Sequence, residues 1–518
     1  MTTTRQAPRP TRAEGGVPHS ARPGGTAGRI VLGLALALLS GGLATLAFPP
    51  FELWPLVWVA FVPMVVAQHR VMPARWSGVA IGVGFGAYFS GQLSNGLAQD
   101  SVAIAFQLLP LYVALLVTAL AWRSRAFHER TGYRWLAVSM PVAWVALDFL
   151  RATGQALFGG TWANPVYALF RHPAFLQPVS VFGIYGLELL ILVVNFALAG
   201  VAIAVLDRRS GRVPSVPWTP SLRNLGLVVA AVGAWGLLSV ALLDSPGPGD
   251  QMVRVAAVQT GVGAEWDAGP DDPAVQERLR RDVEQTRDAA EQGAQLVVWS
   301  EKGLRFDPRE RPDELRALAA ETGAYLAIGY GYEDEEGRKL NEATLLAPDG
   351  ELLGRYGKDH PGTFAGDYSD TGGTYPVYET ELGPISTIIC YDLDFTDTAR
   401  KMTRNGARLV AAPSSDVTAI TETHYTHLVF RSIENRVPTV KADTRFDSAI
   451  IDPWGRILAR TVNPGGATQA TLVADVPLGS GRSPFVSLGD WVGWLCVVGA
   501  AGFVGLSWWT RRRPSPTR

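Results

Sequence analysis

Long apolar segments fill the first half of the chain and return once near its end. Seven of them come in succession, and an eighth follows a long charged region. The eight segments are residues 30–48, 54–69, 76–97, 102–122, 134–150, 178–206, 224–243 and 488–509. Each has close to the ~20 apolar residues that an α-helix needs to cross the hydrocarbon core of a bilayer. The pattern predicts a polytopic helical membrane bundle of about eight transmembrane helices.

Positive charge alternates between the loops that join these segments. Arginines follow the second, fourth, sixth and eighth segments, beginning at Arg70, Arg123, Arg208 and Arg511. The loops 48–54 and 95–100 contain neither Lys nor Arg. Because basic loops stay in the cytoplasm, the alternation predicts that both termini are cytoplasmic and that the long charged region is extracytoplasmic.

The charged region has the shorter periods of a globular domain. Apolar, β-branched runs occur at 253–259, 295–301, 324–330, 385–392 and 407–416, and charged helical stretches occur at 272–293 and 308–322. Strands that alternate with helices predict a layered α/β domain. The glycine motifs of nucleotide-binding folds do not follow any of these runs, so a nucleotide-binding fold has no support.

These patterns divide the chain into five parts. Residues 1–29 are rich in Pro, Gly, Thr and Arg and have no apolar periodicity, which predicts a disordered basic cytoplasmic tail. A seven-helix transmembrane region is expected at 30–244 and an extracytoplasmic catalytic domain at 245–486. The eighth transmembrane helix is expected at 487–510, and a second basic cytoplasmic tail at 511–518.

Composition removes several classes of function. The 46 Lys and Arg residues balance 47 Asp and Glu residues, so the chain as a whole gives no reason to expect a nucleic-acid partner. The only cysteines are Cys390 and Cys496, which excludes a disulfide-stapled scaffold and a four-thiolate metal centre. His360 has no second His or Cys at ligand spacing, and we therefore predict neither a metal nor a cofactor.

Three reactive side chains stand at or near predicted strand ends, where sites form in α/β folds. Glu301 ends one apolar run, Cys390 nearly ends another, and Lys358 stands in the loop 355–360. A thiol becomes a nucleophile as thiolate, with a base and a cation nearby, and an ammonium can stabilise an oxyanion. The set is chemically complete for acyl transfer through a thioester. The spacing alone also fits a core cysteine with a solvated Glu and Lys.

The order of the motifs around these residues resembles a known superfamily. WSE at Glu301, YGKDH at Lys358 and ICYD at Cys390 are similar to the nitrilase, or carbon–nitrogen hydrolase, superfamily, whose members have an αββα sandwich and a Glu–Lys–Cys triad. The stretches 41–64, 178–195 and 431–444 resemble one branch of it, the apolipoprotein N-acyltransferase family. The resemblance covers almost all of residues 30–510.

The resemblance implies a reaction, its partners and a location. Cys390 would take an acyl chain from a membrane phospholipid and pass it, through a thioester, to the N-terminal amine of diacylglyceryl-cysteine lipoproteins. Glu301 would be the general base, and Lys358 would stabilise the oxyanion. The implied partners are phospholipid, diacylated apolipoproteins and the bilayer, in a bacterial cell membrane. No cofactor is implied.

Departures from the family pattern leave alternatives open. Ser300 and Lys302 flank the base, Asp367 stands where a Glu is expected, and Asp392 is one methylene shorter than the usual Glu. Tyr391 is expected to pack beside the nucleophile. A membrane-tethered amidase that uses water, or a weak or inactive paralogue that binds lipoproteins, remains possible on the sequence. A transporter lacks support because no internal repeat is evident.

The outer side of the membrane region contains further candidates. Asp148 and Arg151 are spaced for a helical ion pair or for a lipid head-group contact. Glu188 lies among Leu and Ile in the sixth segment, where an ionisable group faces a bundle interior or lies near the interface. The aromatic loop 159–170, with Trp162, predicts either an interfacial belt or a lid over the acyl or acceptor pocket.

Overall fold

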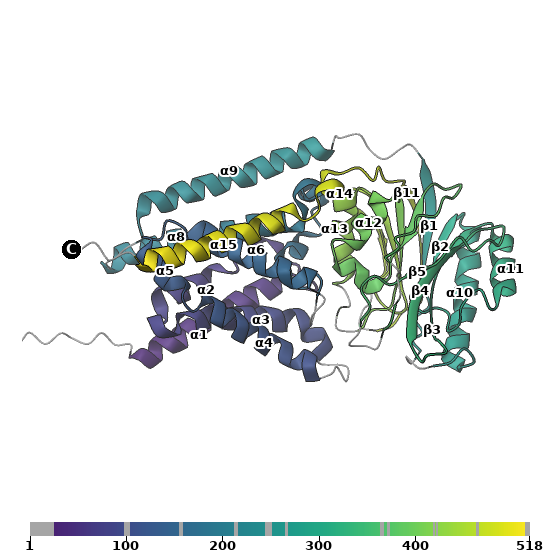
Figure 1. Cartoon of the computed structure of the whole chain (residues 1–518), viewed down its shortest axis with the longest axis horizontal. Coiled ribbons are helices and arrows are strands. Elements are labelled where there is room, and N and C mark those ends of the chain that lie inside the picture. The colour runs from purple at the N-terminus through teal and green to yellow at the C-terminus, as the bar shows by residue number, and fades with distance from the viewer. Residues whose placement is uncertain are drawn as a thin grey trace, which may run out of the picture.

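The computed structural model of the chain is elongated, with helices at one end and two sheets at the other (Figure 1). It describes residues 25–97, 104–154, 159–211, 216–243, 251–264, 268–362, 367–369, 373–417, 420, 423–462 and 466–512. Most of the predicted N-terminal tail, residues 1–24, lies outside the described residues. Helix α1 begins at Thr26, a few residues before the predicted end of that tail. Most of the predicted C-terminal tail, 513–518, also lies outside the described residues.

Among the described residues, seven long helices form the membrane half. They are α1 (Thr26–Leu46), α3 (Ser77–Leu97), α4 (Ile104–Ala121), α6 (Leu136–Thr153), α8 (Val179–Ser210), α9 (Trp218–Leu243) and α15 (Trp491–Arg512). Within the described residues, six helical stretches are long and apolar enough to cross a membrane, and α3 is not among them. Glycines at 78, 82, 84, 86 and 91 lower the hydropathy of α3 and let it pack closely on α1 and α4. The count of eight spans therefore stays a prediction.

The second predicted span is not one continuous helix. Residues 54–71 form three short pieces instead: η1 (Trp54–Trp58), α2 (Val62–Val66) and η2 (Ala67–Val71). Pro55 and Pro63 each remove a backbone donor, which interrupts helical hydrogen bonding. The Asn195 side chain, from α8, supplies two of the missing hydrogen bonds. It accepts from Phe61 N at 2.9 Å and donates to Val57 O at 2.9 Å. Irregular backbone is tolerated at this depth because the protein itself surrounds it.

The α/β half contains two sheets. One has the strand order β11-β1-β2-β3-β4-β5 and the other β10-β9-β8-β7-β6. The first is built from Met252–Gln259 (β1), Leu296–Val298 (β2), Tyr325–Glu333 (β3), Lys339–Leu346 (β4), Tyr356–Gly357 (β5) and Ala470–Pro477 (β11). The second is built from Ile385–Thr387 (β6), Leu409–Ser414 (β7), Thr439–Asp443 (β8), Ala449–Ile451 (β9) and Ile457–Arg460 (β10). Strands β1, β2 and β3 are parallel to one another, as are β6, β7 and β8.

Helices cover the outer face of each sheet, so the predicted αββα sandwich is confirmed. Helices α10 (Pro273–Glu291) and α11 (Pro312–Thr322) lie against the six-stranded sheet. Helices α12 (Thr398–Arg404), α13 (Tyr425–Asn435) and α14 (Pro484–Leu488) lie on the other side, toward the membrane helices (Figure 1). Val255 and Leu296 of the first sheet pack with Ala411 and Val440 of the second in the buried layer between them.

The two halves share one continuous apolar core. Val429 and Phe430 of α13 belong to the same buried cluster as Tyr167 and Ile184 of the membrane half. Polar contacts reinforce this junction, because Ile184 N donates to the Glu434 carboxylate at 3.1 Å. The α13 layer is therefore fixed directly on the membrane bundle.

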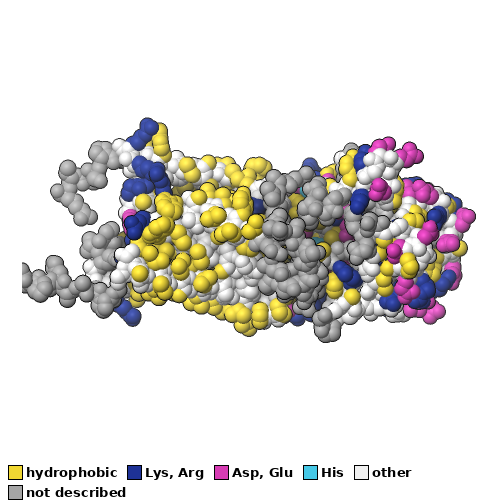
Figure 2. Space-filling view, turned by 90° about the horizontal axis from the view of Figure 1, so that it is seen from below, with side chains coloured by type: hydrophobic (Ala, Val, Ile, Leu, Met, Phe, Trp, Pro, Cys, Tyr) yellow, Lys and Arg dark blue, Asp and Glu magenta, His cyan; other side chains and the backbone are white. Residues whose placement is uncertain are grey.

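The surface differs sharply between the halves. Hydrophobic side chains cover the sides of the helical half, and Lys and Arg gather at its end farthest from the sheets (Figure 2). Leu111 and Leu115 of α4, Leu237 of α9 and Val504 of α15 are among the exposed apolar residues. Charged side chains of both signs cover the α/β half. Such an apolar belt on the helical half is what contact with lipid requires.

Candidate active site

The candidate nucleophile lies in a tight turn at the end of a strand. Strand β6 ends at Thr387, and the 3₁₀ turn η6 runs from Cys390 to Asp394, so the apolar run at 385–392 is not strand throughout. Cys390 has a left-handed backbone, with φ at 44°. Such a conformation is uncommon for a residue with a side chain and must be held by its surroundings.

Asp392 holds this turn. Its carboxylate accepts hydrogen bonds from Ile389 N at 2.9 Å, from His360 N at 2.8 Å and from Tyr356 Oη at 2.7 Å. The residue is buried, and burial raises its pKa to about 6. Asp392 therefore connects the nucleophile turn to the loop after Lys358. It makes these contacts although it is one methylene shorter than the Glu usual in the family.

The candidate base and the candidate oxyanion-stabilising cation form a buried ion pair. Lys358 Nζ lies 2.9 Å from Glu301 Oε1 and 3.1 Å from Asp367 Oδ2. Asn341 Nδ2 also donates to both carboxylates, at 2.6 Å to Glu301 and 3.2 Å to Asp367. Residues 301 and 358, which follow β2 and β5, thus come together with Asp367, and all are nearly inaccessible to solvent.

Lys302, the unusual neighbour of the base, completes this cluster. Its Nζ lies 2.8 Å from Asp367 Oδ1, and its φ is 52°. Two ammonium groups therefore face two carboxylates, Glu301 and Asp367. Burial lowers the pKa of Lys302 to about 8, although both carboxylates oppose that shift.

The charges of the cluster set the resting protonation states. Burial would raise the pKa of Glu301, but the ammonium groups of Lys358 and Lys302 outweigh it and hold the pKa below its usual value. Burial raises the pKa of the Cys390 thiol well above its usual value; Glu301 adds to that shift, and Lys358 opposes it. At rest these charges favour a neutral thiol at Cys390 and an ionised carboxylate at Glu301.

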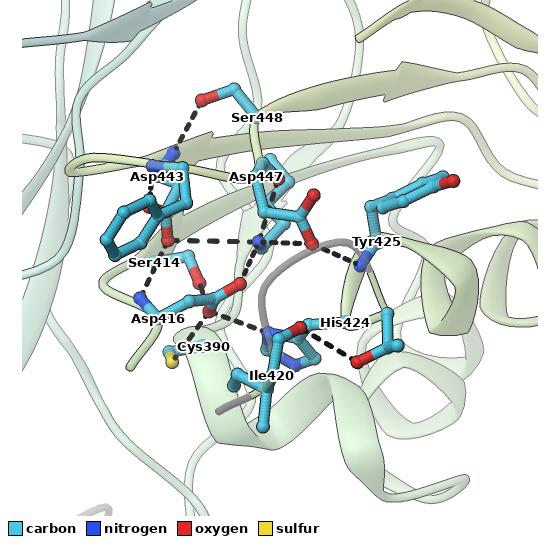
Figure 3. A network of polar contacts seen from close by, with 12 residues as sticks. Cys390, Ser414, Asp416, Ile420, His424, Tyr425, Asp443, Asp447 and Ser448 are labelled. Carbon is cyan, nitrogen blue, oxygen red and sulfur yellow. Dashed lines mark hydrogen bonds and ion pairs between the residues drawn. The ribbon is translucent and has the colours of Figure 1, made fainter. Parts of the chain in front are cut away.

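A second buried charged network also reaches Cys390 (Figure 3). Asp416 Oδ1 lies 3.8 Å from Cys390 Sγ and 2.7 Å from His424 Nδ1, and its other oxygen lies 2.6 Å from Lys441 Nζ. Asp443 accepts from Asp416 N at 2.7 Å. The sequence analysis missed this network. The signal was available in the run 439–443, TVKAD, where two charged residues stand inside an otherwise apolar strand.

Two predicted supporting residues connect the site to the membrane half. Tyr391 Oη donates to Gly159 O at 2.8 Å, so its side chain reaches the loop before η4 (Pro165–Leu169). The sequence predicted that Tyr391 packs beside the nucleophile and did not predict this contact. Trp162, from the same loop, is stacked with His424 at a ring-centroid distance of 5.8 Å.

A cavity lies where this loop meets the bundle and α13. It is small, open to solvent on one side and largely apolar. Its lining includes Phe48, Phe89, Trp162, Tyr167, Thr426 and His427. Because its walls come from both halves of the molecule, an apolar chain bound there would lie between the bundle and the α/β half.

The polar candidates of the membrane half were also located. Arg151 Nη2 lies 2.6 Å from Asp148 Oδ1, which confirms the predicted ion pair, and it also donates to Trp162 O at 2.9 Å. The pair thus holds the loop that carries Trp162, while contact with a lipid head group stays a prediction. Glu188 is fully buried in α8, and Cys496 is buried in α15.

Comparison with known proteins gives two matches at the level of families. Residues 40–197 match the apolipoprotein N-acyltransferase N-terminal domain, and residues 254–483 match the carbon–nitrogen hydrolase family. The second match contains Glu301, Lys358 and Cys390.

Whole relatives align over nearly the entire chain. The chain is 28% identical to an apolipoprotein N-acyltransferase from Geobacter metallireducens, with 91% of this chain and 94% of the relative covered. It is 23% identical to the protein of the same name from Vibrio vulnificus, with 92% and 97% covered. An omega-amidase from Xenopus tropicalis is 27% identical but covers only 40% of this chain and 85% of its own length. With both domains matched in order and the relatives aligned almost end to end, the chain belongs to the apolipoprotein N-acyltransferase family of the carbon–nitrogen hydrolase superfamily.

Proposed function

We propose that the chain transfers an acyl chain from a membrane phospholipid to the N-terminal amine of diacylglyceryl-cysteine lipoproteins through a thioester at Cys390. The observation that carries this proposal is the buried Glu301–Lys358 pair, whose charges act on a cysteine in a turn that contacts the membrane half. A base, a cation and a thiol in that arrangement supply the parts that acyl transfer needs.

In the first half of the reaction, Glu301 accepts the proton of the Cys390 thiol. The sulfur then attacks the carbonyl carbon of the phospholipid ester, and Lys358 stabilises the oxyanion of the tetrahedral intermediate. The C–O bond to glycerol breaks, and the lysophospholipid alkoxide takes the proton from Glu301. The products are an acyl thioester at Cys390 and a lysophospholipid.

In the second half, the lipoprotein amine attacks the thioester carbonyl. Glu301 accepts the proton that the amine loses, and Lys358 again stabilises the oxyanion. The C–S bond then breaks, and the leaving thiolate regains a proton from Glu301. The lipoprotein carries a new amide, and the enzyme returns to its resting state.

The membrane half gives both lipids a way to approach the cysteine. The Trp162 loop, which contacts Tyr391 and the α13 layer, also borders the apolar cavity. We propose that this cavity receives an acyl chain and that Trp162 covers it. The loop would then act as the lid predicted from its aromatic composition.

We also propose the extracytoplasmic orientation of the α/β half, with residues 30–244 and 487–510 in the bilayer and both ends of the chain in the cytoplasm. Supporting it, α8 and α15 each carry arginines in their last turn, and basic residues gather at the end of the bundle away from the sheets (Figure 2). A fluorescent protein fused after Arg518 should fluoresce, while alkaline phosphatase at the same place should be inactive. The reverse result would overturn the orientation.

The activity is tested with the full-length protein in detergent–phospholipid micelles. A phospholipid with a labelled acyl chain and a synthetic diacylated lipopeptide should give a triacylated lipopeptide and a lysophospholipid in equal amounts. Release of labelled fatty acid without lipopeptide acylation would favour a hydrolase, a role to which the omega-amidase likeness points. Lipopeptide binding without either product would favour a non-catalytic paralogue. Either outcome would overturn the proposed transfer.

A further inference from the structure

Two imidazoles and a carboxylate converge beside the nucleophile turn. Asp394 ends η6, His424 directly precedes α13, and His427 lies in the first turn of α13. His427 Nδ1 lies 2.5 Å from Asp394 Oδ1, and His424 Nε2 lies 3.6 Å from the same oxygen. All three side chains are buried, with at most 3% of a side chain exposed.

The atoms that face one another in this cluster lack satisfactory hydrogen bonds. Among the described residues, no hydrogen bond of acceptable geometry ends on either carboxylate oxygen of Asp394, on His424 Nε2 or on His427 Nδ1. Leaving that many buried polar atoms unsatisfied is costly. One ligand atom from each residue lies within 4.8 Å of the others, which is a spacing that a single cation can bridge.

The second nitrogen of His424 is already committed. His424 Nδ1 lies 2.7 Å from Asp416 Oδ1, and Asp416 is fixed in turn by Lys441. A carboxylate that binds one imidazole nitrogen orients the ring and leaves the other nitrogen as a lone-pair donor, which is the arrangement usual behind metal-bound histidines. His424 Nε2 therefore presents a metal ligand toward Asp394.

A neighbouring cluster of two carboxylates and one imidazole, Asp359, Asp397 and His360, has carboxylates that are paired by other side chains. His360 Nε2 lies 3.0 Å from Asp397 Oδ1, and Asp359 accepts hydrogen bonds from Thr398 and Tyr375. Lys401 adds a positive charge to both of these carboxylates. That cluster is neutralised by its own residues and needs no ion.

We propose that Asp394, His424 and His427 bind one divalent cation of the zinc type. Two imidazoles and one carboxylate match the ligands of zinc sites that keep a fourth position for water, with bonds of about 2.0–2.2 Å. His427 also lines the apolar cavity. The cation would tie η6 to α13 beneath Trp162 and would position Asp416 beside Cys390. It is a positioning site, separate from the Glu301–Lys358 pair.

The sequence analysis predicted no metal because it considered only His360. The missed signal is the spacing of His424 and His427, three residues apart at the start of what the structure shows as helix α13. Asp394 could not be added from the sequence, because it lies 30 residues earlier and meets the histidines only when η6 packs against α13.

Metal content tests the proposal without reference to acyl transfer. The full-length protein is purified in detergent, stripped with a chelator, reloaded with Zn²⁺, desalted and measured by mass spectrometry of the metal. The wild type should hold about one zinc per chain, as a single four-coordinate site does. Asp394→Asn and His427→Gln should each lose nearly all of it. Asp397→Asn, the same substitution in the neighbouring cluster, should keep it.

Thermal unfolding gives a second measurement. A cation that binds only the folded state raises the melting temperature, so Zn²⁺ should raise that of the stripped wild type and of Asp397→Asn. It should not raise that of Asp394→Asn. A wild type that holds no stoichiometric zinc and shows no shift overturns the proposal, as does an Asp394→Asn protein that binds zinc like the wild type. If Asp394→Asn does not fold, the wild-type content and shift decide.

Discussion

Two buried charged clusters act on Cys390, and they are built in different ways. The first cluster consists of ion pairs between side chains, and its members are Glu301, Lys302, Lys358 and Asp367. In the second, backbone donors hold two of the three acids: the Asp443 carboxylate accepts from three backbone N–H groups, and that of Asp447 accepts from Tyr425 N. Lys441 occupies the centre of the second cluster, within strand β8.

The difference separates chemistry from scaffold. Side chains that are paired only with other side chains can gain or lose a proton without the loss of any backbone hydrogen bond. This property suits the proposed roles of Glu301 and Lys358. Acids that fix the ends of β7 and β8 and the start of α13 cannot lose their charge without loosening those elements. Substitutions in the first cluster should therefore change rate most, and substitutions in the second should change stability most.

The largest effect on rate is expected at the nucleophile itself. Cys390→Ser should lower acyl transfer by on the order of 10³-fold or more, because loss of a covalent nucleophile removes the two-step route. Cys496→Ser, in α15, should leave transfer within about twofold, since a conservative change far from the site does not alter the transition state. Initial rates with labelled phospholipid and lipopeptide make the comparison. Equal losses in both variants would contradict the assignment of Cys390.

Next comes the base. Glu301→Gln keeps the size of the side chain and its contact with Asn341 but cannot accept a proton, so transfer should fall by about 10²–10⁴-fold. The free energy of unfolding should change much less than in the second cluster, because Lys302 and Lys358 still pair with Asp367. Glu342→Gln, at a buried carboxylate of β4, is the matched control and should retain activity. Activity in Glu301→Gln comparable to that control would remove Glu301 from the mechanism.

The second cluster should respond in the opposite way. Lys441→Met leaves Asp416, Asp443 and Asp447 without their central cation and should reduce the free energy of unfolding by about 3–5 kcal/mol, as breaking a buried ion pair does. Lys401→Met, in a half-exposed pair, should cost no more than about 1 kcal/mol. Denaturant unfolding of both proteins in the same detergent tests this. Similar stabilities would mean that the Lys441 network is not a scaffold.

The smallest effect concerns Lys302 and appears in the pH profile. Its pKa is lowered to about 8, so the ammonium is present below that pH and is lost as the pH rises through it. Asp367 then loses one of its two cations, and transfer should decline above about pH 8. In Lys302→Met that alkaline decline should be absent, with a rate lowered about tenfold at neutral pH. An unchanged alkaline limb in the variant would show that another group causes it.

Local pattern was enough to predict two long strands and two covering helices, whereas the grouping of Glu301, Lys358 and Cys390 also needed the family resemblance. The strand runs at 253–259 and 324–330 and the helices at 272–293 and 308–322 all appear in the structure. Each depends on periodicity within its own segment. The Glu301–Lys358 pair forms because β2 and β5 run in the same direction, so both residues follow strand ends at the same edge of the sheet.

Features that depend on distant partners could not be predicted in this way. The segment 54–71 is broken because Pro55 and Pro63 interrupt it and Asn195, far along the chain, satisfies its backbone. Lys302 departs from the family pattern, and its ion pair with Asp367, at 2.8 Å, joins residues that are far apart in the sequence. The convergence of Asp394 with His424 requires α13 to pack against η6, and no spacing within either segment encodes that contact.

The acyl thioester at Cys390 is the central claim, and the intact mass of the purified protein tests it most directly. Incubation with phospholipid in the absence of lipopeptide should add the mass of one acyl chain to the wild type. Hydroxylamine, which cleaves thioesters, should remove that mass, and lipopeptide should remove it as triacylated product. Cys390→Ala should gain nothing, whereas Cys496→Ala should behave as the wild type. A wild type that stays unmodified while it acylates lipopeptide, or an adduct that persists in Cys390→Ala, would contradict the account.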